Sequence, residues 1–224
     1  MELQAALDIV DLDRAVALAA LIDGHVDRIE VGTPLILRHG ISAVAAVKAA
    51  APGSVIVADC KTMDCGKLNV ALAIEQGADG VIVQGAAPVA TVAAAAIKAA
   101  ELHRFLMVDD LGVRDLRGLA HDMQGLIVSN VIIHTGKDEQ AHGATPAARP
   151  AEAAGISGLA PLAVAGGIDP SNLPDLIGTQ PVEVVIVGEA IYDSDEPTVV
   201  VEQLRHLLEE RAEKGQVSHV GNGV

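Results

Sequence analysis

The sequence predicts a single-domain (β/α)8 TIM barrel, an α/β fold in which eight parallel strands close on themselves. Eight short apolar runs alternate with helix-like segments, which is the pattern of βαβ units and a parallel sheet. Half of the 224 residues are hydrophobic, with one Phe, one Tyr and no Trp. This aliphatic composition, mostly Ala, Val, Leu and Ile, suits closely packed parallel strands covered by helices. The length also fits, since such barrels usually have about 250 residues.

The first half of the chain contains four of the expected strand–helix units. Val26–Val31 alternates apolar and polar residues like a strand, and Gly32-Thr33-Pro34 breaks it. Pro52-Gly53 ends the second helix. The expected strands cover 3–7, 26–31, 54–59 and 80–83, and the expected helices cover 12–21, 41–50, 67–76 and 88–101.

The second half repeats the alternation with one weaker unit. A polar run containing Gly143, Pro146 and Pro150 predicts a long loop, so only a short helix is expected after it. The expected strands cover 105–108, 126–133, 162–165 and 184–187, and the other expected helices cover 113–121, 170–177 and 198–214.

No linker or change of composition divides the chain. We therefore expect one barrel domain over residues 1–214 and a flexible tail over 215–224. An open doubly wound sheet is the alternative, but no GxGxxG motif opens a helix after the first strand.

Charge and cysteine content restrict the function classes. The formal net charge of −15 argues against a nucleic acid or an anionic membrane as partner. No apolar stretch approaches the length of about 20 residues that a membrane helix needs, and no signal peptide is recognised. Cys60 and Cys65 form neither a CxxC pair nor a disulfide framework, so we interpret both as reduced packing residues of a cytoplasmic protein.

Ionisable residues follow strand after strand. Asp8, Glu30, Asp109 and His134 each stand at a strand end, and Asp59, Lys61 and Asp64 follow the third strand. Any one of these could be a solvated turn with a surface salt bridge. A closed barrel would bring them together at the carboxyl ends of its strands, where such barrels carry their active sites. The pattern therefore predicts a catalytic pocket.

Glycines, in place of the ionisable residues, follow the last two strands. Gly166-Gly167 follows the seventh strand, and Gly188-Glu189 follows the eighth. Exposed backbone N–H groups in these turns could bind an anion, and many barrels hold a substrate phosphate at this place. The alternative is a pair of tight turns that need glycine only for positive φ.

Two carboxylates are candidate metal ligands. Glu30 and Asp59 would be neighbours at the ends of adjacent strands, and carboxylate oxygens suit Mg²⁺. His134 is a single histidine, and we interpret it as an acid/base or hydrogen-bonding group.

These motifs resemble the orotidine 5′-monophosphate decarboxylase suprafamily. Within it, the chain is similar to the 3-hexulose-6-phosphate synthase and 3-keto-L-gulonate-6-phosphate decarboxylase family. The matching stretches run in order over residues 3–197: LDIVDLDRA, IEVGTPLI, ADCKTMDCG, GADGVIVQGAA, MVDDLGV, IIHTGKDEQAHG, AVAGGI and VIVGEAI.

The resemblance implies a homodimer that acts on a sugar phosphate, with sites near the interface and Asp64 reaching into the partner's site. It implies Mg²⁺ on Glu30 and Asp59, Lys61 near enediolate oxygens, and His134 as acid/base group. The remaining implied contacts are with substrate: Asp8 and Asp109 in the pocket, and the backbone of Gly166, Gly167, Gly188 and Glu189 at the phosphate.

Two details favour the synthase, which adds formaldehyde to ribulose 5-phosphate. Lys61-Thr62-Met63-Asp64 and His134-Thr135-Gly136 are similar to it, whereas the decarboxylase usually has His-Arg-Ser-Arg at the second place. Glu189 departs from the family pattern; either its side chain turns outward or the ligand is different. The decarboxylase and a non-catalytic phosphosugar-binding barrel are the alternatives.

Overall fold

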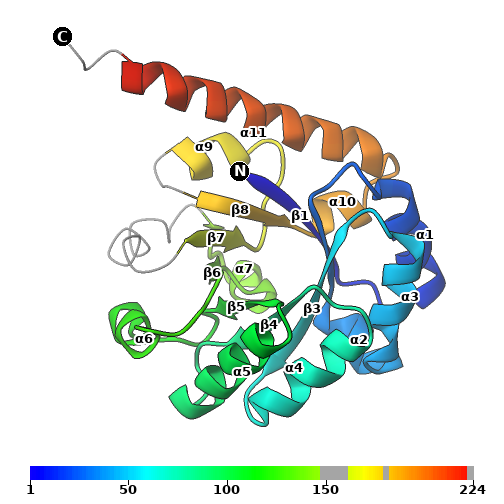
Figure 1. Ribbon diagram of the computed structural model, residues 1–224. Coiled ribbons are helices and arrows are strands. Elements are labelled where there is room, and N and C mark those ends of the chain that lie inside the picture. The colour runs from blue at the N-terminus through cyan, green and yellow to red at the C-terminus, as the bar shows by residue number, and fades with distance from the viewer. Residues whose placement is uncertain (147–160, 179–181, 221–224) are drawn as a thin grey trace.

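The eight strands close into a parallel barrel in the order β1 to β8, which confirms the predicted fold class. The computed structural model describes residues 1–146, 161–178 and 182–220. Figure 1 shows the helices arranged around the outside of the strands. The strands are β1 (Glu2–Leu7), β2 (Arg28–Val31), β3 (Val55–Thr62), β4 (Gly80–Gln84), β5 (Phe105–Asp109), β6 (Asn130–His134), β7 (Leu162–Ala165) and β8 (Val182–Val187).

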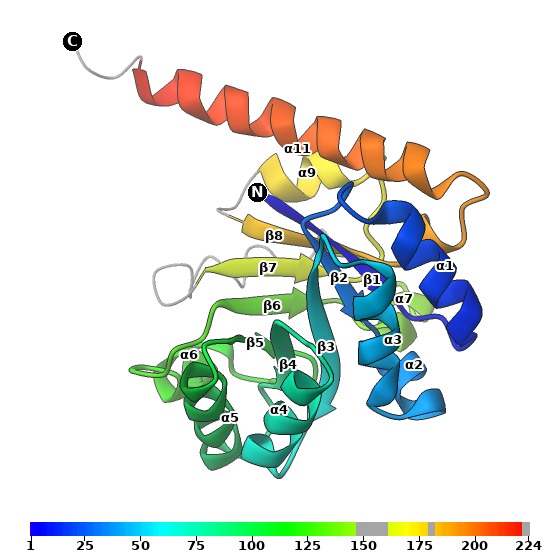
Figure 2. The ribbon, with the colours of Figure 1, turned by 45° about the vertical axis from the view of Figure 1, so that its right-hand side comes forward.

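Most of the expected helices occupy the connections between consecutive strands. In Figure 2, α11 crosses the same side of the barrel as α9 and β8. The helices are α1 (Leu12–Ile22), α2 (Thr33–His39), α3 (Ser42–Ala50), α4 (Gly66–Glu75), α5 (Val89–Glu101), α6 (Leu116–Asp122), α7 (Lys137–Ala141), α9 (Leu173–Gly178), α10 (Glu189–Tyr192) and α11 (Pro197–Val220).

Three short helices were not predicted, and all three follow strand ends at the pocket. Gly32-Thr33-Pro34 ends β2 as expected, but it also begins α2, because proline is favoured in a first helical turn. The start of the polar run after His134 forms α7, and Glu189 begins α10. The short helix expected after Pro150 begins within 147–160, which lie outside the described residues.

Several predicted element bounds need correction. Among them, α6 begins at Leu116 and not at Val113, and α9 begins at Leu173 and not at Pro170. β6 begins at Asn130 and not near Leu126, because its ladder with β5 starts only at the pair Met107 and Asn130. β3 runs past Asp59 to Thr62 through a register shift. α11 continues from Lys214 to Val220, since a glycine inside a helix costs only about 1 kcal/mol. The flexible tail over 215–224 stays a prediction, with its last four residues outside the described part.

Side chains alternate between the two faces of each strand, which produces two separate cores. Outward residues such as Leu3, Leu7 and Ile29 pack under the helices in the larger core. The inward residues fill the barrel with a smaller apolar cluster: Ala6, Val57, Ile82, Met107, Ile132, Ala163, Ala165, Val184 and Ile186. This interior cluster forms the floor on which the pocket rests.

The two cysteines differ in environment. Cys60 packs against the larger core, as expected, and burial raises the pKa of its thiol to about 12. Cys65 is exposed, so its interpretation as a packing residue is wrong. It precedes α4 in a left-handed conformation with φ of 56°, and that turn directs it away from the strand.

The described helices include none that is both long and apolar enough to cross a membrane.

Candidate active site

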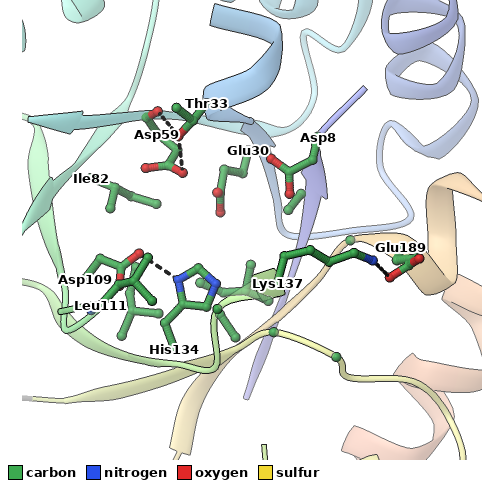
Figure 3. Close-up of a pocket in the computed structure, with 18 of the residues that line it drawn as sticks. Asp8, Glu30, Thr33, Asp59, Ile82, Asp109, Leu111, His134, Lys137 and Glu189 are labelled. Carbon is green, nitrogen blue, oxygen red and sulfur yellow. Dashed lines mark hydrogen bonds and ion pairs between the residues drawn. The ribbon is translucent and has the colours of Figure 1, made fainter. Parts of the chain in front are cut away.

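A pocket of about 380 Å³ opens at the carboxyl ends of the strands. Strand alternation explains four of its polar residues, because each of them stands two positions after an inward apolar residue. These pairs are Ala6 and Asp8, Val57 and Asp59, Met107 and Asp109, and Ile132 and His134. Figure 3 shows Asp8, Glu30, Asp59, Asp109 and His134 facing the same space. The predicted convergence of strand-end groups is therefore present.

The register shift in β3 frees Lys61 from the ladder. Asp59 pairs with Ile82 and Thr62 with Val83, so Cys60 and Lys61 are extra residues on this strand. Lys61 has a φ of 40°, a conformation that side-chain-bearing residues rarely adopt. Such strain is tolerated where the surrounding structure enforces it, often at functional sites. Here it accompanies a Lys61 side chain that lines the pocket.

Lys61 connects two buried carboxylates. Its Nζ lies 2.8 Å from Oδ2 of Asp59 and 3.3 Å from Oδ2 of Asp109. His134 Nδ1 lies 2.8 Å from the same Asp109 oxygen. Asp59, Lys61, Asp109 and His134 thus form one continuous charge network across the pocket.

The network changes the pKa values of its members. Burial alone would raise the pKa of Asp109, but the hydrogen bond and charge of His134, with the charge of Lys61, lower it. Burial alone would lower the pKa of His134, whereas the hydrogen bond to Asp109 and its charge raise it. Burial also opposes the charge on Lys61, and Asp59 and Asp109 outweigh it, so the pKa of Lys61 is raised. The site thus holds a lysine that stays protonated and a histidine that can exchange a proton.

The opposite wall of the pocket has an excess of negative charge. Burial and the charges of Asp59 and Asp8 raise the pKa of Glu30 well above its ordinary value. Asp8 is exposed at the rim, but the surrounding protein partly removes water from its carboxylate. This desolvation and the charge of Asp59 raise the pKa of Asp8 as well. Oδ1 of Asp59 is buried without a hydrogen-bond partner among the described residues. A cation beside Glu30 and Asp59 would offset the repulsion among these carboxylates and give Oδ1 of Asp59 a partner. The residues therefore fit a divalent metal.

The donor set suits an oxygen-preferring ion. In the described part of the chain, no group of three or more His, Cys, Asp and Glu side chains is arranged to hold a metal. Mg²⁺ does not need one, because it usually takes one or two carboxylates and completes its shell with water and substrate oxygens. Glu30 and Asp59 therefore remain the candidate ligands.

The glycine turns line the same pocket. Gly166 and Gly167 have φ of 93° and 68°, so the positive-φ explanation applies to both. A Cβ on Gly166 would lie 2.0 Å from the Thr135 carbonyl oxygen, so a close backbone approach also requires glycine. Gly188 has a φ of −111°, which any residue can adopt. Positive φ thus does not explain Gly188, where an added Cβ would lie 3.3 Å from Cε1 of Tyr192.

Glu189 makes an ion pair across the pocket mouth. Its carboxylate contacts Nζ of Lys137, and Figure 3 shows the Lys137 side chain extended toward it. Both side chains are more than half exposed, at 54% and 68%. The Glu189 carboxylate is thus turned toward Lys137 at the rim, and the choice between the two arrangements given above stays a prediction.

Asp64 is the one predicted site residue that the described structure does not bring into this pocket. It is exposed beyond the end of β3, and its carboxylate accepts a hydrogen bond from the backbone N–H of Cys65 at 2.7 Å. Asp64 lines a separate groove between α4 and α5.

Several polar residues at the site were not predicted, and three of them make hydrogen bonds to predicted site residues. Thr33 donates to Oδ2 of Asp59 at 2.8 Å, and Oδ1 of Asp110 accepts from the His134 backbone N–H at 2.9 Å. Gln4 donates to Oε2 of Glu30 at 2.5 Å. The available signal was alternation, which places Gln4 on the inward face of β1 together with Ala6 and Asp8. Nothing in the sequence identified the hydrogen bonds of Thr33 and Asp110.

The chain has a closed (β/α)8 barrel with acidic, lysine and histidine side chains in the pocket at the carboxyl ends of its strands. These features place it in the class of (β/α)8-barrel enzymes. The model of the orotidine 5'-phosphate decarboxylase / HUMPS family matches residues 1–204, and the chain belongs to this family.

Three similar proteins support this assignment. A 3-hexulose-6-phosphate synthase of Mycobacterium gastri is 38% identical over 209 residues, covering 93% of this chain and 100% of the relative. A crystal structure of 3-hexulose-6-phosphate synthase from Salmonella typhimurium is 33% identical, with a TM-score of 0.89 and coverage of 94% and 100%. A 3-keto-L-gulonate-6-phosphate decarboxylase structure from Vibrio cholerae is 30% identical, with a TM-score of 0.83 and coverage of 93% and 97%.

The predicted resemblance is therefore confirmed. Relatives named 3-hexulose-6-phosphate synthase are lyases, and the chain is an enzyme with carbon–carbon lyase activity. The non-catalytic alternative is set aside.

The network makes a prediction about His134. Replacing Asp109 by Asn removes a negative charge and an acceptor, so the pKa of His134 should fall relative to the wild type. NMR titration of the imidazole carbon-bound protons in metal-free protein measures this pKa. Asp138→Asn removes an exposed carboxylate from the same pocket rim and should leave the pKa of His134 in place. An unchanged pKa in Asp109→Asn would contradict the network.

Proposed function

We propose that this enzyme catalyses the aldol addition of formaldehyde to ribulose 5-phosphate, as a 3-hexulose-6-phosphate synthase. The observation that carries the proposal is the Asp59–Lys61–Asp109–His134 network, which shares one pocket with two glycine turns. The network offers proton transfer and charge stabilisation, and the turns offer a place for a phosphate. The relatives named as synthases support the substrate choice.

His134 is the proposed acid/base group. Its neutral imidazole removes a proton from C1 of ribulose 5-phosphate, next to the C2 ketone, which gives an enediolate. C1 then attacks the formaldehyde carbon to form the new C–C bond, and the former aldehyde oxygen takes the proton back from the imidazolium. Asp109 supports both steps, because it orients the ring and stabilises the imidazolium.

Lys61 is the proposed stabiliser of the enediolate. Its ammonium is already held in the pocket by two carboxylates, so it need not be reorganised when negative charge develops on the substrate. Mg²⁺ held by Glu30 and Asp59 would add Lewis-acid polarisation of the substrate oxygens. The unpaired Asp59 oxygen and the repulsion among the carboxylates support this metal.

The phosphate is proposed to lie against the backbone N–H groups of Gly166, Gly167, Gly188 and Glu189. Lys137 would supply the cation. Its ion pair with Glu189 is exposed, and such pairs are worth only about 0.2–1 kcal/mol. A phosphate dianion can therefore replace Glu189 as the partner of Lys137, with Asp8 lining the sugar end of the pocket.

Decarboxylation of 3-keto-L-gulonate 6-phosphate is the second candidate. In that reaction a C–C bond breaks, CO₂ leaves, and the enediolate is protonated instead of attacking an aldehyde. The 30% identity to the Vibrio cholerae decarboxylase supports this second reaction as a candidate.

We also propose a homodimer formed through α4 and α5. Large apolar side chains are exposed on these helices, among them Leu68 at 57% and Ile97 at 58%. The groove between the helices also includes Asp64. A second copy seated on this face would cover the apolar residues and receive Asp64 near its own pocket, which explains why Asp64 is absent from the pocket of its own chain.

The assay that tests the function follows ribulose 5-phosphate with and without formaldehyde. We expect formaldehyde-dependent loss of the sugar phosphate that stops with EDTA and returns with Mg²⁺. CO₂ release from 3-keto-L-gulonate 6-phosphate, with no formaldehyde-dependent turnover, would instead establish the second candidate. Lys61→Ala is the matched inactive control: it should keep its circular dichroism spectrum and lose at least about 10³-fold in kcat/KM.

The phosphate site makes a separate prediction. Glu189→Gln removes a like charge and frees Lys137, so KM for the sugar phosphate should fall about twofold to fivefold at low ionic strength. The gain should shrink in high salt, because the pair is exposed. Asp195→Asn, the same charge change at a nearby exposed position, is the control. An increase in KM in Glu189→Gln would show that the carboxylate assists substrate binding.

The dimer is tested by mixing two inactive variants. Asp64→Asn supplies an intact Lys61, and Lys61→Ala supplies an intact Asp64, so each hybrid dimer regains one complete site. Random exchange of subunits should restore about a quarter of wild-type activity. Leu68→Glu should reduce the mass in sedimentation from two chains to one. A mixture that stays inactive although subunits exchange would refute the placement of Asp64 in the partner's site.

A further inference from the structure

Gln4 lies inside the barrel directly below the acidic wall of the pocket. It is on β1, fully buried at 0% exposure, and it pairs in register with Arg28, one inward layer below Glu30. Its Nε2 donates to Oε2 of Glu30 at 2.5 Å. Gln4 contacts the acidic group from beneath, whereas Glu30 itself lines the pocket.

Burying the Gln4 side chain at this position destabilises the fold. Apart from Arg28, which reaches Met107, the interior cluster around the barrel axis is apolar. Oε1 of Gln4 is buried there with no hydrogen-bond partner among the described residues. An unpaired buried acceptor destabilises a fold, and Met would fill a similar volume without that penalty. The compensation available to Gln4 is its bond to Glu30.

The bond has a definite direction. An amide nitrogen offers hydrogens, and a carboxylate oxygen accepts them. The reversed amide would set Oε1 of Gln4 against a carboxylate oxygen. The observed arrangement occupies Oε2 of Glu30 from below and leaves Oε1 as the oxygen available to the pocket.

We propose that Gln4 is the positioning residue for Glu30, which it holds with one oxygen free to bind a divalent cation. The inference deepens the proposed function and rests on its metal site. Partners behind a metal ligand fix its orientation, and their loss typically weakens metal binding about 10-fold to 100-fold. On the other side of the site, Thr33 and Lys61 both contact Oδ2 of Asp59, while its Oδ1 has no hydrogen-bond partner among the described residues.

The experiment measures metal binding without turnover. Gln4→Met keeps the volume and removes the donor, and Mn²⁺ binding to metal-free protein is followed by electron paramagnetic resonance, with Mg²⁺ as competitor. We expect both ions to bind at least about 10-fold more weakly, while inorganic phosphate binds within about twofold of wild type. A purely structural role for Gln4 would weaken both ligands or neither.

Gln84→Met is the matched control. Gln84 is also a buried barrel glutamine with an unpaired Oε1. It lies on β4, two strands from Glu30 and one strand from Asp59, and it is not among the residues that line the pocket. Its replacement should change thermal stability by a similar amount and leave Mn²⁺ affinity within about twofold.

The outcomes separate the two proposals. Wild-type protein that binds neither ion refutes the metal site, and the role of Gln4 with it. Wild-type protein that binds Mn²⁺, with Gln4→Met binding it equally well, overturns only the role of Gln4. Gln4→Asn keeps the amide but shortens its reach, and it is measured in parallel in case Gln4→Met does not fold. Weaker metal binding in Gln4→Asn supports the inference, and wild-type affinity refutes it.

Discussion

The ammonium of Lys61, held between two buried carboxylates, is the interaction on which the pocket depends. Asp59 and Asp109 are almost completely buried, at 3% and 2% exposure. Charges at such positions persist only when they are paired and hydrogen-bonded. Lys61 pairs with both, and through Asp109 it is linked to His134. The same cation thus pairs with both buried carboxylates and is linked through Asp109 to the residue proposed to move the proton.

Much of this site follows from strand periodicity. Once Ala6, Val57, Met107 and Ile132 are placed inside the barrel, the residue two positions later must face the axis at the carboxyl end. That rule places Asp8, Asp59, Asp109 and His134 in one pocket. The sequence prediction needed only their position at strand ends, because a closed barrel brings those ends together. The fold class was predictable for a similar reason, because eight alternating units of this length have few ways to bury two-sided strands.

Other features could not be predicted, because they depend on departures from regular periodicity or on contacts between distant segments. The register shift that frees Lys61 has no recognisable sequence signal, and neither does the left-handed turn that exposes Cys65. The bonds of Gln4, Thr33 and Asp110 depend on which neighbour each side chain reaches after the barrel closes. The family resemblance supplied roles for individual residues, whereas the structure supplies the order in which they are connected.

The lining of the pocket is divided by chemistry around its circumference. Ionisable groups come from the ends of β1, β2, β3, β5 and β6, while the glycine turns follow β7 and β8, with Glu189 directly after Gly188. A sugar phosphate anchored at the glycine turns must extend its carbon chain toward His134 and Lys61. The distance across the barrel mouth then determines how many carbons separate the phosphate from the atom that reacts. In the proposed binding mode, a substrate with one carbon too few would bind its phosphate and leave its ketone short of His134, so the strands themselves would select the chain length of the substrate.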